Sequence, residues 1–362
     1  MRLAYLTDIH ADFEAVRSVL PFLQSHSPDL VLAAGDYLNT GFATTEEMIQ
    51  HRHLSREMWT LVARSPDLFR LSPQEALRCL PALAERSLNQ DSDSQEKEVA
   101  ARYLDSLDKA DDHMTMLYRV LKDSLDASGL PYLCLPGNYD KDLADTPLRD
   151  RDLHHHVQEV RGLRLGGYGG ASPAQGGVYI PSLPGGVLDA RPFPAIPVEL
   201  TVPYNEFLYG PHLVSEPLEF FLKEQPDIAC LHNPIYKYLD RDQGSRGMHQ
   251  YALAGKTALF LSGHMHEARG VQRVQTSVPS FSRFPVALNP GNFGREKLAS
   301  EKRQEKLGAG YFALVELDET EKRFETAHFY CLAHPKSADS VTLVGEAFRN
   351  QNNELRTLLP GR

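Results

Sequence analysis

Seven side chains of types that bind metal ions occur along the chain in five short groups. They form an Asp-x-His pair, a single Asp, a single Asn, a single His and a His-x-His pair: Asp8 and His10, Asp36, Asn138, His232, and His264 and His266. Carboxylate, imidazole and amide donors without a thiolate suit ions such as Mn, Fe, Zn or Ni. Two such ions about 3.5 to 4 Å apart can share a bridging carboxylate and clamp a phosphoryl group. The donor types therefore predict two divalent metals.

Most of these donors follow apolar segments that read as buried strands. The segment Arg2 to Thr7 ends at Asp8, and Leu30 to Ala34 ends at Gly35 and Asp36. Similar runs at 131–135, 228–231 and 258–261 precede the later donors, and further strands are predicted at 270–276 and 286–288. In open α/β sheets, ligands bind at the carboxyl ends of strands, so distant donors can converge there. A lone histidine after a strand is usually a packing or capping residue, but the ordered set favours a site.

The elements between the strands define a main domain and an insertion. Apolar residues recur at helical spacing after the first strand, which predicts a β-α-β unit. Three helical segments then replace the expected next strand: one begins at the capping box of Thr44 and Glu47, one at Ser72 to Glu75, and one covers Ser94 to Asp126. We expect a main domain of residues 1–38 and 131–334, a helical cap inserted at 39–130, and a C-terminal tail at 335–362.

The remaining segments carry weaker signals. The Pro- and Gly-rich stretch from Ala171 to Pro217 is predicted to be a loop over the site. Residues 311–317 and 323–330 are typical of a β-hairpin, and the polar tail after them is predicted to form a terminal helix. The histidine triplet at 154–156 is predicted to lie in an exposed loop, and the glycine run at 166–170 to be a strand with a close backbone approach.

Composition excludes several classes of protein. The 362 residues include 38 Lys and Arg against 48 Asp and Glu, a net charge of -10, which disfavours nucleic acid as a partner. The four cysteines lie far apart without C-x-x-C spacing, which argues against a disulfide framework or a structural zinc site. No apolar run is long enough to cross a membrane, and the first strand leaves no room for a signal peptide. We therefore expect a cytoplasmic protein without a membrane partner.

The ordered groups resemble a known family. Asp8-Ile9-His10, Gly35-Asp36, Gly137-Asn138-Tyr139-Asp140, His232 and Gly263-His264-Met265-His266 are similar, in this order, to the motifs of the calcineurin-like metallophosphoesterase superfamily. The resemblance implies an α/β fold, a four-layer α-β-β-α sandwich with its site at the strand ends. It also implies the ligand sets: Asp8, His10 and His266 for the first metal, Asn138, His232 and His264 for the second, and Asp36 as the bridge.

The resemblance further implies a reaction. A metal-bound hydroxide would attack the phosphorus of a small phosphate ester, and Asn138 would help to hold a phosphate oxygen. The third group departs from the family, because Tyr139 replaces the usual histidine that an acid, here Asp140, would orient. A phenol has a pKa near 10 and is a poorer general acid at pH 7 than imidazole. We therefore expect catalytic roles for Asn138, Tyr139 and Asp140, and a preference for phosphodiesters over alkyl monoesters.

Two alternatives to a phosphodiesterase stay open. One is a phosphomonoesterase acting on proteins or nucleotides, and the other is a catalytically weak scaffold for protein interaction. The complete ligand set favours an enzyme over a scaffold. Arg246 is a further candidate for contact with a substrate phosphate. The pattern leaves open the identity of the metals and whether the protein forms a homo-oligomer.

Overall fold

The computed structural model describes residues 1–62, 73–89, 93–171, 196–209, 212–277, 285–294, 310–333, 340–350 and 354–358. The chain divides into two compact units. The first consists of Met1–Leu38, Tyr118–Ser172 and Val202–Arg362, and the second of Asn39–Leu117 and Pro173–Thr201. Each unit is described separately below.

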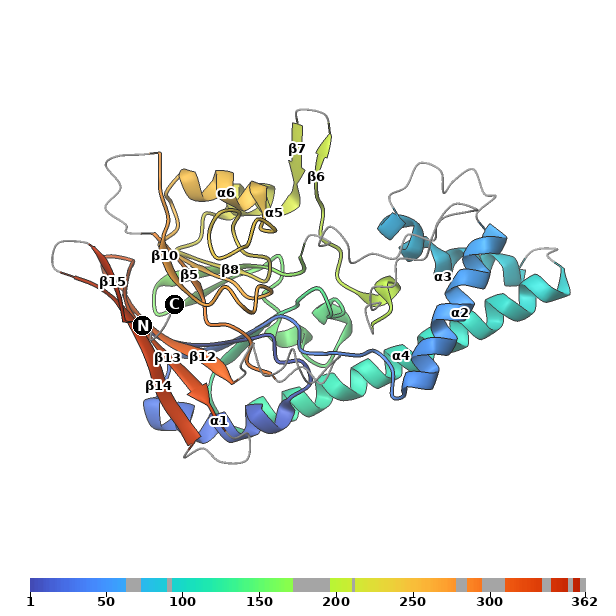
Figure 1. The fold of residues 1–362 in the computed structure, drawn as a ribbon, viewed down its shortest axis with the longest axis horizontal. Helices are drawn as coiled ribbons and strands as arrows, with labels where there is room; N and C mark the ends of the chain where they lie inside the picture. Colours follow the sequence, from blue (N-terminus) through green and yellow to red (C-terminus); the bar gives the residue numbers. More distant parts are fainter. Residues whose placement is uncertain are drawn as a thin grey trace. The chain divides into compact units, whose positions relative to one another are not determined.

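Two sheets form the centre of the first unit (Figure 1). In its described part, one sheet has the strand order β15-β14-β13-β12-β1-β2-β3. Strands β1, β2 and β3 are parallel, and the others pair antiparallel. The bounds are β1 (Arg2–Thr7), β2 (Leu30–Ala34), β3 (Tyr132–Leu135), β12 (Tyr311–Asp318), β13 (Arg323–Leu332), β14 (Val341–Arg349) and β15 (Leu355–Leu358).

The second sheet has the order β10-β11-β9-β8-β5-β4 in the described residues. Its four inner strands are parallel, and the edge strands β4 and β10 are antiparallel to their neighbours. The bounds are β4 (Val157–Val160), β5 (Leu163–Tyr168), β8 (Ile228–Leu231), β9 (Leu259–Leu261), β10 (Gly270–Arg273) and β11 (Val286–Asn289). A separate hairpin is formed by β6 (Glu206–Tyr209) and β7 (His212–Ser215).

The two sheets pack face to face, with helices on their outer faces. Alternate residues of both sheets, such as Leu3 of β1 and Leu165 of β5, belong to one buried cluster. On the outer face of the second sheet, Phe221 of α5 (Glu216–Glu224) and Met248 of α6 (Arg246–Leu253) pack against buried strand residues. Phe22 of α1 (Phe13–His26) contacts aromatic rings of the first sheet. Because both faces of the sheets are covered at their centre, the inner strands β1, β2, β8 and β9 are nearly continuous apolar runs. The four-layer α-β-β-α sandwich is confirmed.

Polar residues define where these helices begin. Asp12 caps α1 by accepting a hydrogen bond from the Ala15 amide. Ser215 and Ser245 cap α5 and α6 in the same way. Such side chains satisfy backbone N–H groups that the first turn leaves without partners. The first unit also contains the short 3-10 helices η2 (Leu143–Asp145) and η3 (Arg149–Arg151).

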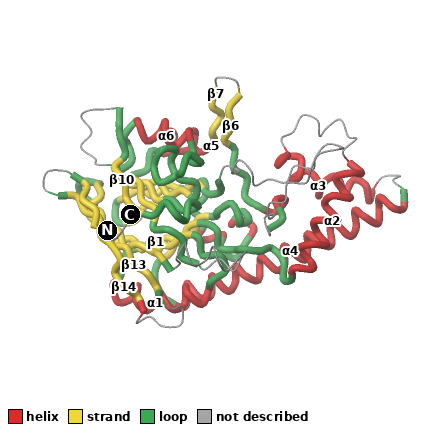
Figure 2. The backbone as a smooth tube through the Cα atoms, viewed as in Figure 1, coloured by secondary structure: helices red, strands yellow, loops and turns green. Residues whose placement is uncertain are grey.

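The described part of the second unit is helical (Figure 2). It contains α2 (Thr45–Val62), α3 (Pro73–Asn89), the first part of α4 (Ser94–Ala127) and η4 (Val198–Leu200). Its apolar core includes Leu54, Leu80 and Tyr103. Thr44 Oγ1 accepts from the Glu47 amide at 3.2 Å, and Glu47 Oε2 accepts from the Thr44 amide at 3.3 Å. The three predicted helices and the first capping box are present, whereas Ser72 lies outside the described residues. That these helices act as a cap stays a prediction.

Several sequence expectations for the first unit were wrong. The polar tail forms strands β14 and β15 rather than a helix, because the exposed edge of β13 offers backbone groups that a neighbouring strand satisfies. Part of the predicted loop at 171–217 forms the β6–β7 hairpin, while residues 172–195 lie outside the described residues. Helices α5 and α6 and strand β4 were not predicted. The β12–β13 hairpin is confirmed.

Among the described residues, none of the helices combines the length and apolar character needed to span a bilayer.

Candidate metal centre

The structure brings six of the seven candidate donors into two groups. Asp8, His10 and His266 form one group, and Asp36, His232 and His264 form the other; within each, one donor atom per residue lies within 4.8 Å of the others. The seventh donor, Asn138, has its Oδ1 3.0 Å from His232 Nε2. All seven follow β1, β2, β3, β8 or β9. Because β1 to β3 are neighbours in one sheet and β8 and β9 in the other, the donors gather where the two sheets end together.

The backbone at several donors adopts an uncommon conformation. The φ angles are +56° at Asp8, +48° at His10, +45° at Asp36 and +62° at His264. Residues other than glycine rarely have positive φ, and such strain concentrates at functional sites. Hydrogen bonds between the first two strand exits hold this conformation: the Asp8 amide donates to Gly35 O at 3.0 Å, and the His10 amide to Asp36 O at 2.8 Å. The donor residues therefore adopt a backbone conformation that the pairing of the strands does not require.

The glycine before each of three donors lets another donor approach the backbone. A Cβ at Gly35 would lie 2.0 Å from His232 Nδ1, and one at Gly137 would lie 2.2 Å from Asp36 Oδ1. A Cβ at Gly263 would lie 2.5 Å from Asp8 Oδ2. Any larger residue would push one of these donors away. Glycine at these three positions is therefore explained by the close approach of another donor.

The first group is centred on the buried Asp8 carboxylate. Its Oδ1 lies 3.1 Å from His266 Nε2, and its Oδ2 accepts from Thr7 Oγ1 at 2.7 Å. Burial alone would raise the pKa of Asp8, but the neighbouring imidazoles, His266 foremost, lower it overall. His10 Nε2 and His266 Nε2 face each other at 3.2 Å. An ionised carboxylate beside two converging ring nitrogens is a suitable donor set for a divalent cation.

The second group has the same character. Asp36 Oδ1 lies 3.4 Å from His232 Nε2 and accepts from the Tyr139 amide at 2.9 Å. Burial opposes ionisation of Asp36, but His232 lowers its pKa overall. Burial, and then the charge of His232, lowers the pKa of His264 to about 4, so this imidazole keeps a lone pair for a metal. His232 Nδ1 is buried and has no hydrogen-bond partner among the described residues.

Asp140 has a structural position beside the second group. Its carboxylate accepts from the amides of Gly137 at 2.7 Å and Tyr37 at 3.0 Å, and from the Tyr118 hydroxyl at 3.2 Å. Burial, and then the charge of Asp36, raises the pKa of Asp140 to about 7. These bonds tie together the loops after β2 and β3 and the C-terminal part of α4. Tyr139 places its ring centroid 6.3 Å from that of His10, at the edge of the first group.

A turn after β11 supports the ligand loops. Asn289 Nδ2 donates to Gly263 O at 3.2 Å and to Met265 O at 3.1 Å. The Gly294 amide donates to Asp8 O at 2.8 Å. The sequence signal for this turn is Asn-Pro-Gly-Asn at 289–292. Thr7 and Tyr118 were missed, because a polar residue inside an apolar strand or helix gives no sign of its partner.

The remaining sequence candidates lie outside the two donor groups. Arg246 begins α6; its amide donates to Glu206 Oε1 at 2.7 Å, and its guanidinium lies 4.8 Å from the Tyr236 ring centroid. The prediction of an exposed triplet is wrong for His154, which is buried and accepts from the Gly169 amide at 2.8 Å. Burial lowers the pKa of His154 to about 3. The glycine run does make the predicted close approach: a Cβ at Gly169 would lie 2.4 Å from Pro136 O.

Comparison with known proteins agrees with this geometry. Residues 1–68, which include Asp8, His10 and Asp36, match the family model described as calcineurin-like phosphoesterase. The first 68 residues are thus similar to calcineurin-like phosphoesterases. The two donor groups are candidates to hold metal ions. No curated protein sequence matches the chain significantly.

Several solved structures are similar to the chain. TT1561 of Thermus thermophilus is 13% identical with a TM-score of 0.42, covering 90% of this chain and 96% of that one. A dimetal phosphatase from Danio rerio is 11% identical with a TM-score of 0.43, covering 91% and 95%. The purple acid phosphatase PPD1 from yellow lupin seeds is 10% identical with a TM-score of 0.36, covering 96% of this chain and 53% of its own.

Proposed function

We propose that this protein is a dinuclear phosphoesterase that prefers phosphodiesters to alkyl phosphomonoesters. The observation that supports it is the pair of buried donor groups, each with an aspartate and two histidines, at the common end of two sheets. Asp36 is the proposed bridge, because its carboxylate interacts electrostatically with His232 of its own group and with His10 and Asp8 of the other. A complete donor set favours an enzyme over a non-catalytic scaffold.

The proposed ligands are distributed over both groups. Asp8, His10 and His266 would hold one ion, and Asn138, His232 and His264 the other. When bound, two divalent ions would activate water and neutralise charge on the phosphoryl group. The donor types suit Mn, Fe, Zn or Ni, since no thiolate takes part. The proposed substrate is a small phosphate ester.

Three neighbouring residues are proposed to act on the substrate or to position those that do. The Asn138 amide is proposed to bind a phosphoryl oxygen in addition to serving as a ligand. The Tyr139 phenol is the proposed hydrogen-bond donor to the leaving group. Asp140 is the proposed positioning residue, because it holds the backbone of Gly137 and Tyr37 on either side of the site. Arg246 stays a candidate for a second phosphate contact.

The preference for diesters rests on Tyr139. A phosphomonoester dianion repels an incoming hydroxide, and a poor alkyl leaving group needs a proton. General acid catalysis is worth about a hundredfold to ten-thousandfold, and a phenol supplies less of it at pH 7 than an imidazole. A diester carries one less charge and, with an activated alcohol, needs no acid.

The cytoplasm stays the proposed location. Cys134 and Cys230 are buried thiols in the strands of the core, and the sequence spacing of the cysteines is typical of a reducing compartment.

The proposal is tested by reconstituting the purified protein with Mn and measuring both metal content and hydrolysis. We expect about two ions per chain, cleavage of bis(p-nitrophenyl) phosphate, and little release of phosphate from alkyl monoesters. Asp112→Asn, at an exposed position on α4, is the control that should leave metal content and rate unchanged. Absence of bound metal after reconstitution would overturn the dinuclear site. Efficient hydrolysis of alkyl monoesters would overturn the preference for diesters.

A further inference from the structure

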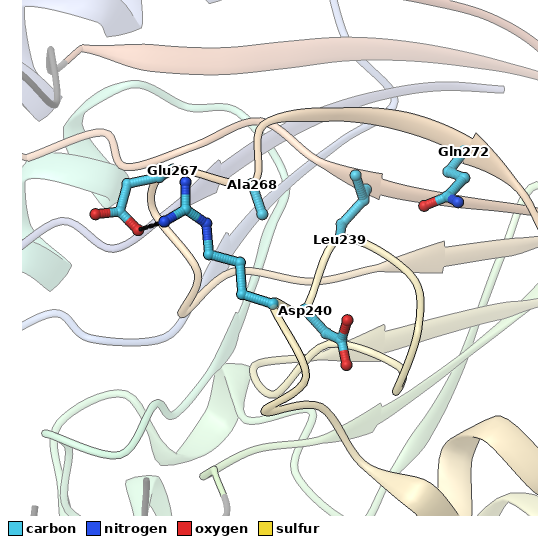
Figure 3. A pocket seen from close by; sticks show the side chains of 6 residues that line it. Leu239, Asp240, Glu267, Ala268 and Gln272 are labelled. Atoms are coloured by element: carbon cyan, nitrogen blue, oxygen red, sulfur yellow. Dashed lines mark ion pairs between the residues drawn. The ribbon is translucent and has the colours of Figure 1, made fainter. Parts of the chain in front are cut away.

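A pocket adjoins the loops that carry two of the candidate ligands. It has a volume of about 510 Å³ and is lined by Leu239, Asp240, Arg241, Glu267, Ala268 and Gln272. Residues 239–241 lie on the loop that follows His232, and Glu267 comes directly after His266. The volume is within the usual range for small-molecule sites. In Figure 3, Glu267 lies at one end of the pocket and Gln272 at the other, with Ala268 and Leu239 between them.

The loop at 233–245 has a specified shape. Four of its residues have positive φ: Lys237, Leu239, Arg241 and Asp242. The buried Asp240 carboxylate accepts from the amides of Lys237 at 2.9 Å and Gly244 at 3.2 Å. Outside the loop, the Gln275 amide donates to the Tyr238 hydroxyl at 3.0 Å and so ties the loop to the chain after β10. A strained backbone held by buried bonds is a feature of ligand-binding loops rather than of ordinary connections.

The exposed polar groups of the pocket are a matched pair of charges. Arg241 Nη1 lies 3.1 Å from Glu267 Oε2, and both side chains are partly exposed. Asp240 is buried and its Oδ2 accepts two backbone bonds, so the exposed polar lining is this pair and Gln272. An anionic ligand would have to displace Glu267 and approach Asp240, and a cationic one would have to displace Arg241. Neutral hydroxyls can accept from Arg241 and donate to Glu267 without breaking the pair.

The apolar lining limits which neutral ligand fits. Leu239 and Ala268 provide apolar surface between the polar ends, suited to the carbon chain of a polyhydroxylated alcohol. We propose that this pocket binds an alcohol group of the phosphodiester substrate and selects a neutral polyol, with Arg241 as the specificity-determining residue. The inference rests on the proposed function, since it assigns a substrate class to the same site.

The test uses mixed diesters of phosphoric acid that carry p-nitrophenol as the reporter. The second alcohol is methanol, ribitol, glycolate or choline. With the Mn-reconstituted protein, we expect kcat/KM for the ribityl ester to exceed that for the methyl ester about tenfold, the effect of one or two hydrogen bonds. Arg241→Gln should lower the ribityl value about tenfold and leave the methyl value unchanged. Glycolate and choline esters should not exceed the methyl ester.

Lys237→Gln is the matched control. Lys237 is an exposed cation of the same loop with positive φ, but it does not line the pocket. This variant should keep the tenfold preference. Equal loss in both variants would show that the loop, and not Arg241, sets the preference, and would overturn the proposal. A preference of the native protein for the glycolate or choline ester would overturn it as well.

A binding measurement separates this inference from the proposed function. Calorimetry with a ribityl phosphinate, in which carbon replaces both ester oxygens and no P–O–C bond is left to cleave, should give a Kd about tenfold higher for Arg241→Gln than for the native protein. Failure to cleave the methyl ester would refute the hydrolase, while the calorimetric difference would still support the pocket. Cleavage of the methyl ester together with equal Kd values for the two proteins would refute the pocket alone.

Discussion

Each unit of the molecule buries a group of histidine and carboxylate side chains, and the two groups differ in how their polar atoms are satisfied. In the helical unit, His51 Nδ1 lies 3.1 Å from Ser106 Oγ and its Nε2 lies 3.2 Å from Ser55 Oγ. Glu199 Oε1 accepts from the Tyr103 hydroxyl at 2.9 Å and lies 3.8 Å from His51 Nε2. Hydroxyl groups of the protein therefore satisfy the polar atoms of His51 and Glu199. We interpret this group as a structural cluster that joins α2, α4 and η4.

The donor groups at the sheet ends include a buried ring nitrogen that none of the described residues satisfies. Ring nitrogens of His10 and His266 face each other, and His232 Nδ1 has no partner among the described residues. Four donors, Asp8, His10, Asp36 and His264, have positive φ, whereas the described residues of the His51 cluster include none with this conformation. Burying such polar atoms is costly unless a cation completes the set. A buried polar atom without a partner, rather than the mere presence of histidine and acid, therefore distinguishes the candidate metal centre from the structural cluster.

The largest expected effect comes from Asp36→Asn. Loss of the proposed bridge removes a charge that serves both ions, so we expect at most one metal per chain and a rate lower by roughly a thousandfold. Elemental analysis and cleavage of bis(p-nitrophenyl) phosphate measure the two effects. Glu199→Gln is the matched control, because it makes the same change in the buried cluster of the helical unit. If Glu199→Gln lost as much metal as Asp36→Asn, the distinction between the two groups would fail.

A smaller effect is expected at Tyr139, beside the first donor group. Tyr139→His supplies an imidazole at the place where the Tyr139 ring lies near His10, so we expect alkyl monoester hydrolysis to rise about a hundredfold, the lower end of the range for general acid catalysis. Cleavage of activated aryl diesters should change less than threefold, roughly, because a good leaving group needs no proton. Steady-state kinetics on both substrates give the ratio. Unchanged alkyl activity in both Tyr139→His and Tyr139→Phe would show that another group protonates the leaving alcohol.

The sequence predicted the positions of the donors well because the signal is local. Each donor lies within five residues of the end of a buried apolar strand, and strand ends are where α/β folds gather ligands. The glycine at 35, 137 or 263 adds a second local sign, since each permits a contact that a Cβ would prevent. Convergence of the groups followed from these two features. The roles of the individual ligands stay predictions.

Other features could not be predicted because they depend on distant partners. Strands β14 and β15 lie in a tail whose pairing depends on the open edge that β13 presents. His154 is buried because the glycine run allows its ring to reach the Gly169 amide. The arrangement of Arg241 with Glu267 joins two loops through contacts that no local pattern encodes. All three features depend on contacts between residues that are distant in the sequence.

The smallest expected effect concerns the His51 cluster of the helical unit. Ser106→Ala leaves the buried His51 Nδ1 without its hydroxyl partner, so the helical unit should lose about 1 kcal/mol of stability while metal content and rate stay unchanged. Ser124→Ala is the control, because Ser124 also lies on α4 and is buried, but it belongs to the first unit, and among the described residues its hydroxyl donates to Val120 O of the same helix. Two units need not unfold together, so hydrogen exchange of α2 amides is the measurement that isolates the helical unit. We expect faster exchange in α2 for Ser106→Ala than for Ser124→Ala. Equal exchange in the two variants would mean that the hydroxyl does not complete the His51 cluster, and that the two buried groups are less different than their contacts indicate.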